Sequence, residues 1–192
     1  MTRAVLSFLA LLFSLTAAQP TVAQDLTNEN FASSVFATFC LATEGNTDRV
    51  KAIGSSMTAQ TPPLAVELSK KDRKELFGKD TTDAWLLSRE PGLEPVYLSL
   101  KKGPRSVVCE ITTTGSISDH KNFFETTLMG HSVRSNGKIY NSGDASFLND
   151  PNIVGHAYTL KTDTTSAYIM LLEERSDNSK DSAVLKLTAL FA

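Results

Sequence analysis

The chain has 192 residues, of which 41% are hydrophobic and 21% are charged, and its formal net charge is −2. This composition is that of an ordinary globular protein, so it excludes a collagen-like chain, a disordered tail and a membrane protein with several spans. A weakly acidic domain is also a poor candidate for nucleic-acid binding, because that function needs a basic surface.

The start of the chain has the layout of a secretory signal. Met1–Arg3 is a short positive segment, and Ala4–Ala18 follows without a charge. This apolar run of about 15 residues is shorter than the ~20 that span a bilayer. An uncleaved anchor or a buried N-terminal helix is the alternative. We predict that residues 1–24 are a cleaved signal and that residues 25–192 form a single exported domain, which makes the protein periplasmic or secreted.

Cys40 and Cys109 are the two cysteines of the chain. Two cysteines of an exported protein usually pair, and neither lies in the Cys-x-x-Cys context of a redox site. We therefore predict a structural disulfide, with a redox or nucleophilic cysteine as the alternative. In the chain-entropy model, closing a loop of this length stabilises the fold by roughly 4 kcal/mol.

Three helices are expected in the first part of the domain. Thr27 can cap the first, which carries an apolar stripe at helical spacing (Phe31, Val35, Phe36, Phe39 and Cys40). Asn46 or Thr47 begins the second, which places Val50, Ile53 and Met57 on one face. Ser69 begins the third with a Ser-x-x-Asp capping box, and Gly78 ends it.

The spacing of apolar residues then changes from the helical period to the alternation that is typical of strands. Residues 84–88 form a short strand with Trp85 and Leu87 on one face, and residues 94–114 read as a hairpin. Cys109 shares the apolar face of its strand with Val107 and Ile111. A bond from there to Cys40 would fix the first helix to the sheet.

A further helix is expected from Ser118, as its cap, to Gly130. Asn136-Gly137 is a hairpin signal, with Val133 before it and Ile139 and Tyr140 after it as strand residues. Residues 141–153 are rich in turn residues and are predicted to be an exposed loop.

Three antiparallel strands should end the chain, over residues 156–162, 166–174 and 182–191. In the last of them Lys186 and Thr188 mark the wetter side. The fold class that follows is α+β: a single twisted antiparallel sheet with the N-terminal helices and one mid-chain helix packed on it. We expect the Cys40 helix and the mid-chain helix on the same face of the sheet.

The search for catalytic residues centres on the histidines. His120 and His131 lie at opposite ends of one predicted helix, roughly 16 Å apart, and therefore cannot share a metal ion. A site built from His131 and His156 is conceivable, and an envelope hydrolase using either one is our alternative function. The chain contains neither a Gly-x-Ser-x-Gly elbow nor a phosphate-binding loop. We therefore assign no catalytic residue, metal or cofactor.

Basic residues cluster twice, at 70–74 (Lys70, Lys71, Arg73 and Lys74) and at a hairpin tip (Lys101, Lys102 and Arg105). Either group could contact anionic polymers of the cell envelope, but a solvated helix and an exposed turn are the favoured explanation of both.

The chain resembles small exported proteobacterial proteins of unassigned function. The resemblance lies in the Phe-x-x-x-Cys helix from Phe36 to Cys40, the Gly-Asn break at Gly45, the strand led by Trp85 and the cysteine at Cys109. It implies a Gram-negative periplasm and a bond between the two cysteines, and it carries over no catalytic residue.

The function predicted from the sequence is a binding or interaction module without catalysis, whose partner is a protein or small ligand of the cell envelope. The ligand would lie on an uncovered face of the sheet or in the loop at 141–153. A secreted effector or inhibitor is a third hypothesis, and detection in the culture supernatant rather than the periplasm would favour it.

Overall fold

The computed structural model describes residues 27–87, 94–104, 106–175 and 183–191. The predicted signal segment lies outside these residues. The described part contains helices on an eight-stranded antiparallel sheet of order β1-β2-β3-β4-β8-β7-β6-β5, which confirms the α+β class. The helical segments are α1 (Asn28–Phe36), the π-helical turn η1 (Ala37–Leu41), α2 (Thr47–Thr58), α3 (Lys70–Phe77), α4 (Ile117–Arg134) and the 3-10 turn η2 (Ala145–Leu148). The strands are β1 (Ala65–Glu67), β2 (Thr81–Leu87), β3 (Val96–Lys102), β4 (Val107–Thr114), β5 (Lys138–Asp144), β6 (Ile153–Lys161), β7 (Ser166–Arg175) and β8 (Ala183–Phe191).

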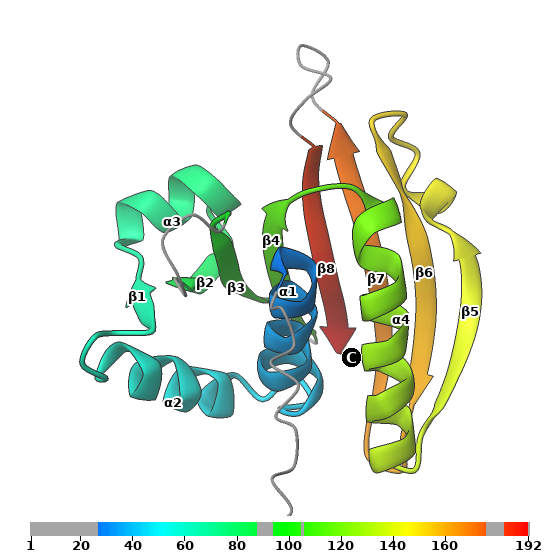
Figure 1. The fold of residues 1–192 in the computed structure, drawn as a ribbon, viewed down its shortest axis with the longest axis horizontal. Coiled ribbons are helices and arrows are strands. Elements are labelled where there is room, and N and C mark those ends of the chain that lie inside the picture. Colours follow the sequence, from blue (N-terminus) through cyan, green and yellow to red (C-terminus); the bar gives the residue numbers. More distant parts are fainter. Residues whose placement is uncertain (1–26, 88–93, 105, 176–182, 192) are drawn as a thin grey trace, which may run out of the picture.

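One face of the sheet is covered by helices, as predicted. Helices α1 and α4 lie side by side in front of the central strands, and α2 lies below β2 (Figure 1). Between this layer and the sheet the alternate residues of the strands form the core, with Trp85, Leu98, Ile111 and Leu187 all nearly or fully buried. Phe124 of α4 contacts Phe36 of α1, with ring centroids 5.5 Å apart. We call this side the covered face.

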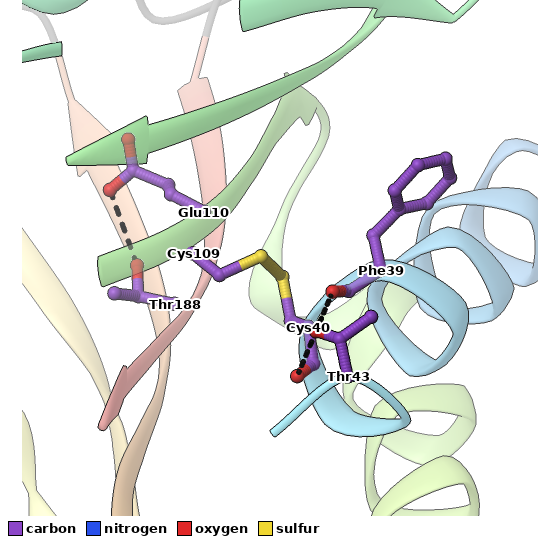
Figure 2. Close-up of a disulfide and its surroundings, with 6 residues drawn as sticks. All are labelled: Phe39, Cys40, Thr43, Cys109, Glu110 and Thr188. Atoms are coloured by element: carbon purple, nitrogen blue, oxygen red, sulfur yellow. Dashed lines mark hydrogen bonds between the residues drawn. A yellow bond between two sulfur atoms is a disulfide. The ribbon is translucent and has the colours of Figure 1, made fainter. Parts of the chain in front are cut away.

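The disulfide joins the helical layer to the middle of the sheet. Cys40 lies in η1 and Cys109 in β4, and their Cα atoms are 5.5 Å apart. Figure 2 shows the bond running from β4 to the end of the first helix, where Thr43 donates a hydrogen bond to the Phe39 carbonyl at 2.6 Å. The predicted pairing is therefore confirmed.

The predicted boundaries of the first three helices agree with the structure. The side chains of Thr27 and Asn46 accept backbone hydrogen bonds at the starts of α1 and α2. Ser69 both accepts from the Asp72 amide and donates to its carboxylate at the start of α3. Gly78 ends that helix with φ of 88°, a conformation that glycine adopts without strain.

Two boundaries predicted for α4 are wrong. The helix begins one residue before Ser118, with Ser116 as its N-cap residue, and it continues through Gly130 to Arg134. A single glycine inside a helix costs only about 1 kcal/mol, so the helix does not end there.

The predicted Asn136-Gly137 hairpin is also wrong, because this dipeptide ends α4. Asn136 has φ of 50°, and the Gly137 amide donates to the Ser132 carbonyl at 2.8 Å. This is the hydrogen bond of a Schellman motif, which needs the same left-handed conformation as a hairpin turn. Val133 is therefore an exposed helix residue, whereas Ile139 and Tyr140 lie in β5 as predicted.

The predicted loop at 141–153 is shorter than expected. Strand β5 continues to Asp144, η2 follows, and β6 already begins at Ile153. The edge strand β1 was not predicted, since it contributes only three residues. The hairpin of β3 and β4 and the three strands β6, β7 and β8 are confirmed. Within the part of the chain that the structure describes, no helix is both long and apolar enough to cross a membrane.

Candidate functional site

The other side of the sheet, which we call the open face, is formed by the alternate strand residues that point away from α1 and α4. Its centre is polar. Ser99, Glu110 and Thr188 are direct neighbours across β3, β4 and β8, and all three are buried. Figure 2 shows Cys109 and Glu110 pointing to opposite sides of β4. The alternation of a single strand thus places a disulfide on one face and a carboxylate on the other.

A groove with a volume of about 550 Å³ lies on this face, within the size range of small-molecule sites. We call it the open-face groove. It is formed by α3 and by strands β3, β4, β7 and β8. Its lining residues are Leu76, Phe77, Tyr97, Lys101, Glu110, Thr112, Glu174, Arg175, Val184 and Lys186.

Helix α3 supplies the apolar wall of the groove. The Phe77 ring meets the Tyr97 ring edge to face, with centroids 5.8 Å apart. Arg73 holds the helix against β2, because its guanidinium donates to the Thr82 carbonyl and lies 3.8 Å from an Asp83 oxygen. Leu76, in the last turn, keeps 54% of its surface exposed.

Charged side chains line the opposite part of the groove in pairs. Lys186 Nζ donates to Glu174 Oε2 at 2.5 Å, and Lys101 Nζ lies 3.7 Å from Glu110 Oε1. Glu110 is 8% exposed, and its other oxygen accepts a 3.3 Å hydrogen bond from Thr188. A carboxylate can accept about four hydrogen bonds, so Glu110 keeps acceptor capacity.

Two buried hydroxyl oxygens of the open face lack a hydrogen-bond partner among the described residues. They are Thr112 Oγ1, which lines the groove, and Ser99 Oγ, on the strand next to Glu110. Buried hydroxyl groups are normally paired, because an unpaired one costs about 1–3 kcal/mol. Both oxygens have almost no accessible surface, so they lie beneath the surface of the groove and are not open to a ligand.

A second cavity, of about 520 Å³, lies at the start of α4, and we call it the α4 cavity. Glu173 reaches it from β7 and accepts a 2.9 Å hydrogen bond from the Ile117 amide and a 2.6 Å bond from Arg175 Nε. Burial alone would raise the pKa of Glu173, but these two partners outweigh it, and the pKa lies below the usual value. The positive end of the helix is thus already compensated by a side chain of the protein itself.

The α4 cavity also contains His156, one of the two histidines of the alternative hydrolase. Its Nδ1 lies 3.9 Å from an oxygen of Asp144, and Ser116 and Ser146 line the same cavity. His131 lies near the opposite end of α4, roughly 20 Å along the helix axis from the cavity. The structure therefore separates the conceivable pair of His131 and His156.

The other two histidines, His120 and His131, are buried residues of α4. His120 fits only because Gly115 has no side chain, since a Cβ there would lie 2.8 Å from its Nε2. Burial holds the pKa of His120 below its usual value, against the opposing charges of Glu29 and Asp119. Burial also lowers the pKa of His131, and the charge of Arg134 lowers it further.

The basic clusters have separate positions. Lys70, Lys71 and Lys74 are exposed on α3, while Arg73 is engaged with β2. Lys101 contributes to the groove, Lys102 is exposed, and Arg105 lies outside the described residues. Among those residues, no three side chains of His, Cys, Asp or Glu come together as a metal site.

Sequence reasoning marked Lys186 and Thr188 as the wetter side of their strand, and it named an uncovered sheet face as one place for a ligand. It did not single out Glu110, Thr112 or the wall formed by α3, because each depends on strands and a helix distant in sequence.

No protein-family model matches the chain, and searches of curated proteins and of solved structures found no similar protein.

Proposed function

We propose that this protein is an exported, disulfide-braced binding module that acts without catalysis and holds a small ligand in the open-face groove. Its place is the periplasm or the extracellular medium, and the proposal includes kinship with small exported proteobacterial proteins. The signal layout of residues 1–24 and the disulfide between Cys40 and Cys109 support export.

One observation carries the choice of site. The groove combines an aromatic wall, which offers apolar contact, with charged groups from four strands, which can orient a ligand. These groups lie on strands that the disulfide and the helical layer support from behind. Such rigid support favours binding, because little conformational entropy is lost when a ligand is held.

The test is native mass spectrometry of the protein purified from its own exported fraction without reductant. We expect the natural chain to retain an adduct, and the double variant K101A/K186A to lose it. The matched control is K138A/K161A, which removes two exposed lysines of β5 and β6 outside the groove. An adduct that survives in K101A/K186A, or no adduct in any chain, would contradict the proposed groove.

The second candidate function is an envelope hydrolase, which the structure favours only at His156. His156 lies close to Asp144 in a cavity that is also lined by serine residues. This observation favours a hydrolase, because a carboxylate can orient a histidine that acts as a base. The H156A variant should then abolish ester hydrolysis by the exported protein, while H131A should retain it. Full turnover in H156A would remove this candidate.

A further inference from the structure

Each of the three cations that line the open-face groove lies beside a carboxylate. Lys101 and Lys186 pair with Glu110 and Glu174, which also line the groove. Arg175 pairs with Glu173, whose side chain lies in the α4 cavity. An ionic ligand would have to compete with one of these pairs and would leave a charge without its partner. The electrostatics of the groove therefore complement a polar ligand without net charge.

The polar side chains of the groove include both acceptors and donors. Glu110 is an acceptor with spare capacity, and Lys101 and Lys186 are donors. A ligand hydroxyl group also donates and accepts, so adjacent hydroxyl groups can bond to the carboxylate and the ammonium groups at once. A ligand with several hydroxyl groups matches these side chains better than an amine or a phosphate.

The wall has a different chemistry. Phe77 and Tyr97 form an edge-to-face pair beside the exposed side chain of Leu76. This surface can take an apolar, C–H-rich face of a ligand, and aromatic rings provide such contact area at a low entropic cost. Pyranose sugars combine the two properties, since they have C–H faces and a rim of hydroxyl groups.

We propose that the open-face groove binds a neutral saccharide. A pyranose ring lies with its C–H face against Phe77 and Tyr97, and its hydroxyl groups bond to Glu110 and the lysines. This inference rests on the proposed function, because it names the ligand class of the same groove.

The test is an NMR titration of the oxidised, ¹⁵N-labelled protein with three neutral disaccharides: cellobiose, maltose and N,N′-diacetylchitobiose. Inorganic phosphate serves as an anionic probe, and glycylglycine serves as a zwitterionic probe that carries an ammonium and a carboxylate group. We expect at least one disaccharide to shift the amide signals of Glu110, Thr112 and Lys186. E110Q should raise its Kd about tenfold or more, because hydrogen bonds to charged groups are worth about 1.5–3 kcal/mol.

A matched pair of tyrosine variants separates binding from folding. Y97A should weaken binding, whereas Y168A, which removes an exposed tyrosine of β7 outside the groove, should not.

Saccharide shifts away from the groove, a Kd that E110Q leaves unchanged, or no saccharide binding would each overturn the inference. If phosphate or glycylglycine alone shifts the groove signals, the saccharide is wrong and the binding groove stands. If K101A/K186A keeps the adduct in native mass spectrometry, the proposed function itself fails.

Discussion

The two faces of the sheet differ most clearly in β4, where Cys109 points into the helical layer and the adjacent Glu110 points into the open-face groove (Figure 2). On the covered face, the neighbours of Cys109 are apolar: Leu100 across β3 and Ala189 across β8. On the open face, the corresponding neighbours of Glu110 are Ser99 and Thr188. Both sets are buried, but only the first set is apolar.

This difference shows that buried residues of one strand can serve two purposes, stability on one face of the sheet and ligand recognition on the other. The covered face removes apolar surface from water and carries most of the stabilisation. The open face buries hydroxyl groups and a carboxylate, which adds little stability and supplies groups for recognition. Substitutions on the two faces should therefore act on different properties, unfolding free energy on one and ligand affinity on the other.

The largest effect should come from the bond that joins the layers. C40S/C109S should lower the unfolding free energy by about 4 kcal/mol, because the unfolded chain regains the entropy of a long loop. Urea titrations of the natural chain and the variant measure this loss of unfolding free energy. Adding a reductant should destabilise the natural chain by a similar amount and leave the variant unchanged. Equal stability of both proteins would show that the disulfide contributes nothing.

Neighbouring residues of β4 offer the sharpest comparison of the faces. I111A opens a cavity in the covered face and should cost about 3 kcal/mol. T112V removes an unpaired hydroxyl from the open face and should leave stability equal or slightly higher. Both unfolding free energies come from urea titrations at one pH. A loss of similar size in the two variants would break the distinction between the faces.

Two helical glycines test how tightly the helices pack on the covered face. A Cβ at Gly54 of α2 would lie 2.7 Å from the buried Trp85 ring, so G54A should cost about 1–3 kcal/mol by overpacking. A Cβ at Gly130 of α4 meets only the end of Arg134, at 3.5 Å. G130A should therefore raise stability by about 1 kcal/mol, as alanine does within a helix. Thermal unfolding of the two variants and the natural chain gives the sign of each change in stability. A gain in stability for G54A would contradict close packing of α2 against Trp85.

The smallest effect concerns pH. The pKa of His120 in the folded protein is lowered from 6.5 by burial, so the unfolded chain binds the proton more readily. Stability should fall as the pH decreases from 6.5 toward the folded pKa, by about 1.4 kcal/mol for each unit of difference. H120Q should reduce this slope between pH 7 and pH 5 in urea titrations. An unchanged slope would assign the acid sensitivity to other groups, such as His131, whose pKa is also lowered.

Local signals predicted most of the fold. The caps Thr27, Asn46 and Ser69 each act within a few residues, so sequence spacing was enough to locate them. Asn136-Gly137 was misread because its left-handed conformation serves both a hairpin and a helix end. The outcome depended on whether Val133 continued a helix or began a strand, and nothing within that dipeptide decides this.

The sequence by itself determined the α+β class, the pairing of two cysteines and the two faces of each long strand, because periodicity and side-chain chemistry are local properties. Only the tertiary structure decided that α3 lies beside Tyr97, that Glu110 and Lys186 share a groove, and that His131 and His156 lie apart. These placements depend on strand order and on helix packing over long separations in the chain. The energies that select them come from contacts among several elements at once.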